Sequence, residues 1–165
     1  MKNLISRYTL TLILTVFHNI FYIIFTPLTI FPIYFILKIF PETSLTDATI
    51  IFNSHSFTFI PACIAGTAYL ILTILTLTSV TNIKKAIKTL TTAYLLLLTS
   101  NIIRILILIF TYNQFGKETF DAIHMVFWHI LSTIIVLIIW IFVTKVYRIK
   151  SIPIYTDIKD LIKSF

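Results

Sequence analysis

Charged residues are scarce in this chain of 165 residues: Asp, Glu, Lys and Arg together make up 12%. Hydrophobic residues make up 58%, which is more than the core of a soluble domain of this size can bury. The low charge and the mean hydropathy of +0.99 therefore exclude an ordinary soluble domain. The apolar residues also form long continuous runs, whereas strands of a membrane β-barrel would show short alternating segments.

Cysteine and glycine are nearly absent, with one cysteine and two glycines. A single cysteine excludes an internal disulfide, a CxxC redox pair and a zinc site built from several cysteines. The histidines form no HxxxH pair, so neither a metal nor a cofactor is expected. The chain also lacks a G-x-S-x-G elbow, an HExxH helix and a glycine-rich phosphate loop.

Basic residues outnumber acidic ones by 13 to 6, which gives a net charge of +7. They flank the apolar runs and do not form a patch with interleaved aromatics, so nucleic acid is not an expected partner. Basic residues at the ends of apolar runs are typical of membrane proteins, in which they set the topology. The sequence predicts an all-α, polytopic transmembrane helical bundle of about 4–5 spans. Residues 1–165 are expected to form one integral membrane domain.

The first apolar run, residues 8–37, contains no Asp, Glu, Lys or Arg, and it includes Pro27 and Pro32. It is too long for one straight span. It forms either two segments, about 8–25 and 28–40, or one broken span, and the pattern does not decide between them.

The remaining apolar runs predict three further spans. They cover about 57–80, 90–111 and 121–144. Polar loops at 41–56 and 112–120 and a basic turn at 81–89 connect the spans, and residues 145–165 form a tail.

Positive residues gather in the basic turn and after residue 145, which predicts that both face the cytoplasm. The two polar loops then face outside. Counted from the outer ends of their spans, Cys63, Arg104 and His124 lie at depths of roughly 9, 12 and 5 Å at 1.5 Å per residue. The three side chains are therefore expected in one layer of the membrane.

Arg104 is the only charged residue between Lys88 and Lys117. A guanidinium inside a span costs several kcal/mol, so it needs a partner or a water-filled cavity. One interpretation pairs it with Asp121 at the outer edge. The other is an anion or oxyanion site, to which Asn101, one turn earlier on the same face, adds an amide donor.

Cys63 is either a structural cysteine in an apolar interior or a nucleophile in the first turns of a helix, where the helix dipole and a nearby arginine favour the thiolate. Gly66 allows another backbone or a substrate to approach closely. His124 is either a packing residue or a general acid and base. His129 lies about 140° further round the helix.

Three segments together resemble the exosortase/archaeosortase family, and its short archaeal members in particular. They are Pro-Ala-Cys63-Ile-Ala-Gly, Asn-Ile-Ile-Arg104 and Asp-Ala-Ile-His124-Met-Val-Phe-Trp, and the likeness covers about residues 57–144. Members of this family are polytopic membrane enzymes with a Cys…Arg…His/Arg trio.

The resemblance implies a membrane cysteine transpeptidase or protease on the extracytoplasmic side of the cell membrane. Its substrates would be exported surface proteins whose C-terminal sorting signal has a short motif, a transmembrane helix and a basic tail. Cys63 would be the nucleophile, Arg104 would stabilise the oxyanion and His124 would transfer protons to an acceptor such as a membrane lipid. His129, which lies at a depth closer to that of Arg104, is the alternative third residue.

Two other functions are compatible with the same residues. In a non-catalytic membrane subunit or assembly protein, Arg104 would anchor neighbouring helices, and Cys63→Ser would have no effect. In a small anion transporter, Arg104 would bind the solute, and transport would not depend on Cys63.

Overall fold

The computed structural model describes residues 2–40 and 42–149, and most of these residues are helical. The elements are, in chain order, α1 (Lys2–Val16), α2 (Asn19–Leu37), β1 (Thr43–Thr46), β2 (Thr49–Phe52), β3 (His55–Thr58), α3 (Pro61–Ile64), α4 (Gly66–Ser79), α5 (Ile83–Val126), the π-helix η1 (Phe127–Leu131) and α6 (Ser132–Val146). The predicted helical class is confirmed, with a small sheet that was not predicted.

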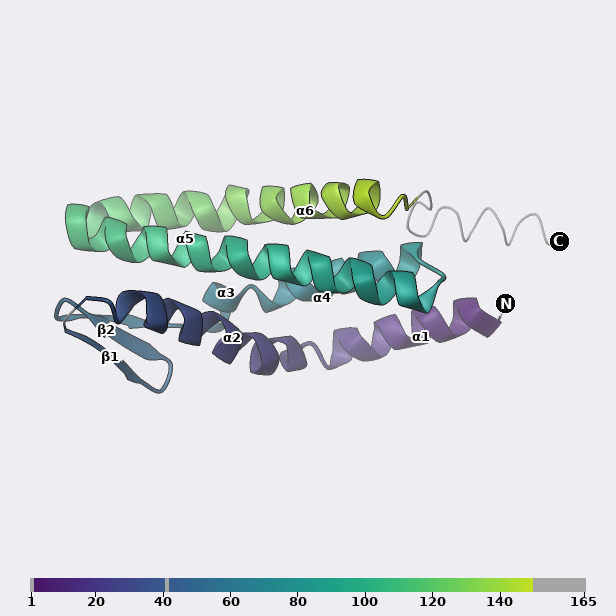
Figure 1. Ribbon diagram of the computed structural model, residues 1–165, viewed down its shortest axis with the longest axis horizontal. Coiled ribbons are helices and arrows are strands. Elements are labelled where there is room, and N and C mark those ends of the chain that lie inside the picture. The colour runs from purple at the N-terminus through teal and green to yellow at the C-terminus, as the bar shows by residue number, and fades with distance from the viewer. Residues whose placement is uncertain (1, 41, 150–165) are drawn as a thin grey trace.

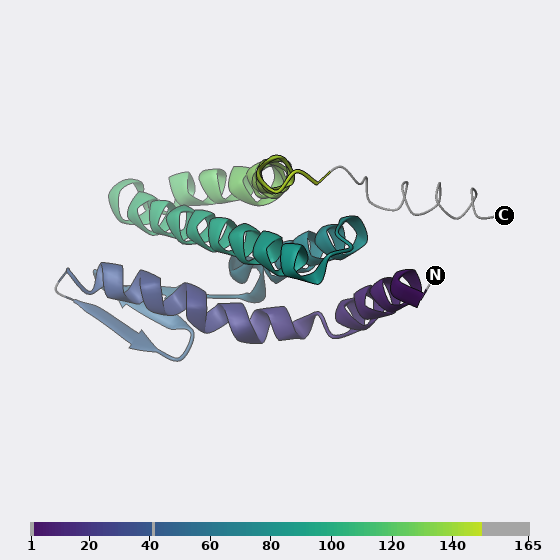
Figure 2. The same cartoon turned by 45° about the vertical axis from the view of Figure 1, so that its right-hand side comes forward.

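The longer helices run along the long axis of the molecule in Figure 1, and Figure 2 shows that the C-terminal part of α6 diverges from α2 and α5. α1 and α2 follow each other end to end, and α5 and α6 lie side by side. Within α5 the chain reverses at Gly116, whose φ of 78° and ψ of −174° are open almost only to glycine. α5 therefore has two arms, 83–115 and 117–126, and the predicted polar loop at 112–120 is a sharp turn between helices.

Two helices, α2 and α5, are long and apolar enough to cross a membrane, and α4 and α6 are apolar but shorter. Large apolar side chains also face outward along the bundle, among them Ile23, Leu95 and Leu137. Such an exterior suits lipid better than water. The fold is therefore compatible with a location in a membrane.

The first apolar run breaks at Phe17 and His18, and not near Pro27 as one of the two alternatives required. Pro27 and Pro32 both lie inside α2. Membrane helices tolerate proline because neighbouring groups satisfy the carbonyls that it frees. The run thus forms two helices, α1 and α2, whose bounds differ from those of the predicted pair of segments.

The predicted polar loop at 41–56 is wrong, because most of it forms a three-stranded antiparallel sheet with the strand order β1-β2-β3. The registers pair Thr46 with Thr49 and Phe52 with His55. The signal in the sequence is short: the β-branched and aromatic run of β2 lies between two turns, and the second turn, Asn53-Ser54, has both residues at positive φ.

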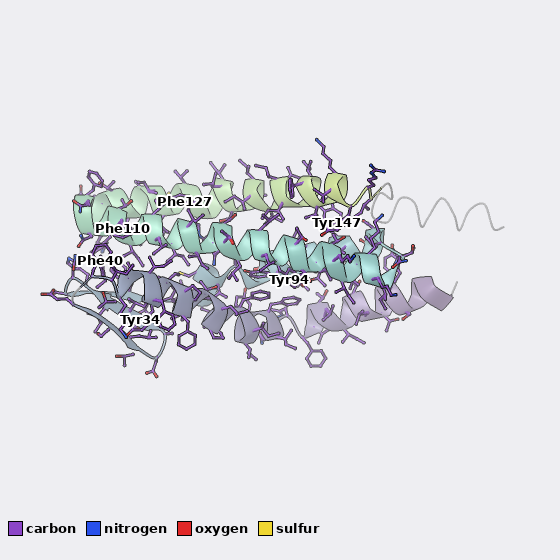
Figure 3. All side chains as sticks on the ribbon, viewed as in Figure 1. Tyr34, Phe40, Tyr94, Phe110, Phe127 and Tyr147 are labelled. Carbon is purple, nitrogen blue, oxygen red and sulfur yellow. The ribbon has the colours of Figure 1, made fainter. Side chains whose placement is uncertain are left out.

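The two ends of the bundle differ in character. At one end, the sheet packs on α5 and on the residues after α2, because the ring centroids of Phe40, Phe52 and Phe110 lie 5.7–6.0 Å apart. Figure 3 labels Phe40 and Phe110 at this end. At the other end, Arg7 donates from Nε to the carbonyl of Leu77 at 2.7 Å and so binds the last turn of α4. The residues from the two predicted outer loops thus share one end, and the predicted basic turn lies at the other.

Candidate functional site

The helix that carries Cys63 is broken at Ala65. The predicted span from residue 57 begins instead at Pro61, because the preceding residues belong to β3 and a short connection. Ala65 has φ 59° and ψ 32°, the left-handed conformation, and it separates α3 from α4. The break leaves the carbonyl groups of α3 without the next helical turn as a partner.

Two side chains from α5 bind the carbonyl oxygen of Cys63. Asn101 donates from Nδ2 at 2.9 Å and Arg104 donates from Nη2 at 3.1 Å. The two residues lie one turn apart on the same helix face, as predicted, and Asn101 is buried. The two side chains therefore satisfy the carbonyl oxygen of Cys63, which the helix break leaves without a helical partner.

Arg104 also donates from Nη1 to Oγ of Ser132 at 3.0 Å. The predicted alternative, an ion pair with Asp121, is therefore replaced by bonds from the two terminal nitrogens to a hydroxyl and a backbone carbonyl. Nε of Arg104 is buried and has no hydrogen-bond partner among the described residues.

Ser132 was not predicted as a site residue. Its Oγ donates to the carbonyl oxygen of Phe127 at 2.7 Å across the π-helical turn η1, and it accepts from Arg104. π-Helical turns are rare in proteins, and those that occur often lie at functional sites. Neither the turn nor its contact with Arg104 has a sequence signature that would have identified this serine.

Cys63, Arg104 and His124 line one cavity of about 220 Å³. They come from α3 and from the two arms of α5, so the turn at Gly116 is what brings His124 back toward the other two. Cys63 is half-buried, and the ring of His124 lies 5.4 Å from that of Phe120. The rest of the lining consists of Ser56, Phe57, Thr58, Phe59, Ile105, Leu108, Ile109, Tyr112 and Phe120.

His129, the alternative third residue, lies in η1, and its side chain is outside the part of the chain that the structure describes. Among the described residues, no three His, Cys, Asp or Glu side chains are grouped so that they could hold a metal ion.

The group that lies closest to Gly66 is the side chain of Tyr22 from α2, whereas a backbone or a substrate was expected there. A Cβ at Gly66 would lie 2.6 Å from Cε1 of the Tyr22 ring, which is too close for any real contact. The hydroxyl of Tyr22 lies 3.3 Å from Oγ1 of Thr67. Gly66 thus fixes α2 against the start of α4, directly after the helix break.

Arg104 also lines a second, larger cavity of about 600 Å³. Its walls come from α3 and α4 on one side and from α6 on the other, and most lining residues are apolar or small, such as Ala62, Ala68 and Trp140. Arg104 therefore lines both the cavity that contains Cys63 and a mostly apolar cavity.

Comparisons of the chain with protein-family models, with curated proteins and with solved structures give no match.

Proposed function

We propose that this protein is a membrane cysteine transpeptidase or protease of the exosortase/archaeosortase type. It cleaves the C-terminal sorting signals of exported surface proteins and transfers them to an anchor, with a membrane lipid as the acceptor. The observation that supports this proposal is the cavity shared by Cys63, Arg104 and His124. A thiol, a guanidinium and an imidazole around one space are the groups that acyl transfer needs.

The reaction would proceed in two steps. The thiolate of Cys63 attacks the scissile carbonyl, the C–N bond breaks, and the leaving amine takes a proton from the imidazolium of His124. The acyl group is then held on Cys63 as a thioester. An acceptor amine gives its proton to His124 and attacks the thioester, which forms the new bond and frees the thiol.

Arg104 would contribute in two ways. Its bond to the carbonyl oxygen of Cys63 holds the backbone that carries the nucleophile. Its positive charge lies at the wall of the same cavity, where it would stabilise the oxyanion that forms on the substrate carbonyl.

The orientation in the membrane follows from charge. In this proposal α2 and α5 cross the membrane, and α4 and α6 complete the bundle of about 4–5 spans. The end with Arg7, Lys85 and Arg148 faces the cytoplasm by the positive-inside rule. The sheet, the turn at Gly116 and the cavity then belong to the extracytoplasmic half.

One observation favours a second candidate, the non-catalytic membrane subunit. Both terminal nitrogens of Arg104 bind groups of the protein itself, Cys63 O and Ser132 Oγ, as an anchor between helices would. In that case Cys63→Ala and Cys63→Ser would have no effect on any processing reaction.

Processing of surface proteins that end in an apolar segment and a basic tail tests the proposal. These precursors are followed in cells that contain the wild-type protein or one of the variants Cys63→Ala, His124→Ala and Arg104→Gln, at equal protein levels. We expect the precursor to accumulate with Cys63→Ala, and Arg104→Gln to slow processing by at least about a hundredfold. His18→Ala, which changes a histidine in a different part of the chain, is the matched control for His124→Ala and should process normally. Equal processing by wild type and Cys63→Ala would contradict the proposal and favour the subunit.

A further inference from the structure

The strand β3 forms one wall of the cavity that contains Cys63. Four consecutive residues, Ser56 to Phe59, line this cavity. Ser56, Phe57 and Thr58 belong to β3, and Phe59 follows it. Successive side chains of a strand point to opposite faces of the sheet, so three strand residues in a row that line one space indicate a space along the edge of the strand. β3 is the last strand in the order β1-β2-β3, so this edge has no strand beside it among the described residues.

The hydrogen-bond pattern identifies which backbone groups point to this edge. Phe59 donates from its backbone N to Ala48 O at 2.8 Å, which makes their pair a hydrogen-bonded one. The next pair, Thr49 and Thr58, is then a non-hydrogen-bonded pair, in which side chains lie closer together, and their hydroxyls are indeed 3.0 Å apart. By the same alternation, the backbone N–H and C=O of Ser56 and Thr58 point away from β2.

The size of the cavity limits what can occupy it. One turn of α-helix, about 10 Å across and 5.4 Å long, fills roughly 420 Å³. The cavity of about 220 Å³ holds only half of that, or about two residues. The cavity therefore has room for only a short segment of a polypeptide, about two residues long.

We propose that the substrate of this protein binds as an extended polypeptide strand that adds to the open edge of β3. Its backbone pairs with the outward N–H and C=O groups of Ser56 and Thr58, and this pairing brings a substrate carbonyl into the cavity of Cys63. Strand addition of this kind obtains affinity from backbone hydrogen bonds and leaves the choice of side chain to the pockets. The inference rests on the proposed function, since it specifies how the substrate of that site is held.

Proline substitutions test the backbone pairing directly. Ser56→Pro and Thr58→Pro each remove an N–H that points to the open edge, while the bonds to β2 are kept. Ser56→Ala and Thr58→Ala are the matched controls, because they change the same side chain and keep the N–H. We expect each proline variant to process precursor about three- to tenfold more slowly than its alanine control, as expected for one lost hydrogen bond. Equal rates for proline and alanine at both positions would overturn the inference.

A cross-linking experiment tests the contact without relying on the rate. The photoreactive residue p-benzoylphenylalanine replaces Ser56 in the Cys63→Ala background, and Ser44 on β1 is the control position. Ser44 is also an exposed serine, but it lies on the opposite edge strand. We expect cross-links from position 56 to precursor residues within a few positions of the cleavage site, and none from position 44. Cross-links to lipid alone, or equal cross-linking from both positions, would overturn the inference.

The two proposals can fail separately. If Cys63→Ala abolishes processing but the proline variants match their alanine controls, the enzyme stands and strand addition is wrong. If Cys63→Ala has no effect on processing, the proposed function is wrong. Cross-linking to precursor from position 56 alone would then still support strand addition at β3, and its absence would overturn that too.

Discussion

Two regions of the molecule bind their helices together in different ways. In the aromatic cluster of Phe25, Tyr69 and Tyr94, regular helices pack through rings: Phe25 stacks on Tyr69 at 3.5 Å, and Tyr94 meets both edge-on at 5.4 Å. Threonines in this region, such as Thr76, donate to the carbonyl four residues earlier in their own helix. Around Cys63, in contrast, polar side chains from one helix bind the backbone of another.

The second region also contains three departures from regular helix: the break at Ala65, the π-helical turn η1 and the reversal at Gly116. Arg104 connects the first two, because it binds the carbonyl oxygen next to the break and the serine at the end of η1. Departures of this kind cost free energy and persist only where the surroundings compensate for them. We infer that the packing free energy of the aromatic cluster offsets the cost of the irregular backbone around Cys63.

The largest effect expected from this comparison is on stability. Phe25→Ala removes a buried ring from the stack and should lower the free energy of unfolding in detergent micelles by about 3–5 kcal/mol. Processing per folded molecule should stay within about twofold of wild type, because Phe25 does not line the cavity of Cys63. A loss of activity at equal amounts of folded protein would show that the two regions are not separate in function.

A smaller effect is expected where the two regions meet. Gly66→Ala places a Cβ against the ring of Tyr22 and should cost about 1–3 kcal/mol of unfolding free energy, the usual cost of overpacking. The double variant Gly66→Ala with Tyr22→Leu should recover most of that loss, which thermal unfolding of the four proteins in the cycle would measure. If the loss is the same in the Tyr22→Leu background, the contact with Tyr22 is not its cause.

The smallest expected effect has the opposite sign. Ala65 is a non-glycine residue in the left-handed conformation, which costs about 1–2 kcal/mol. Ala65→Gly should therefore raise the free energy of unfolding by up to about 1 kcal/mol, part of the gain being offset by the greater entropy of glycine in the unfolded chain. Ala68→Gly, within the regular part of α4, is the control and should destabilise. A loss of stability with Ala65→Gly would mean that the helix break is not strained.

The long apolar runs were readable from the sequence, and the local irregularities of the backbone were not. The apolar runs and the basic residues at their ends predicted the helical class and the grouping of the loops at opposite ends of the bundle. The sheet escaped prediction because each strand is only four residues long, too short for alternation to stand out from a polar loop. The break at Ala65 was not predicted because alanine normally favours a helix. The left-handed conformation of this residue becomes visible only in the folded structure.

Within the candidate site, the partners of Arg104 could likewise not be predicted from the sequence. Its position in an apolar run correctly indicated that it needs a partner inside the bundle. The sequence offered Asp121 as the visible counter-charge, whereas the structure uses the carbonyl oxygen of Cys63 and the hydroxyl of Ser132. A backbone carbonyl has no sequence signature, so this pairing depends on a helix break that is itself unpredictable from local propensity.

The carbonyl of Cys63 also has a consequence for the order of assembly. A ribosome makes Cys63 before it makes Asn101 and Arg104, the two residues that donate to this carbonyl. In the proposed membrane location an unsatisfied carbonyl would cost several kcal/mol, so a chain that lacks α5 would be more stable with an unbroken helix through residue 65. Cys63 would then acquire its final surroundings only after α5 is in place, so that the proposed site would form at a late stage of biogenesis.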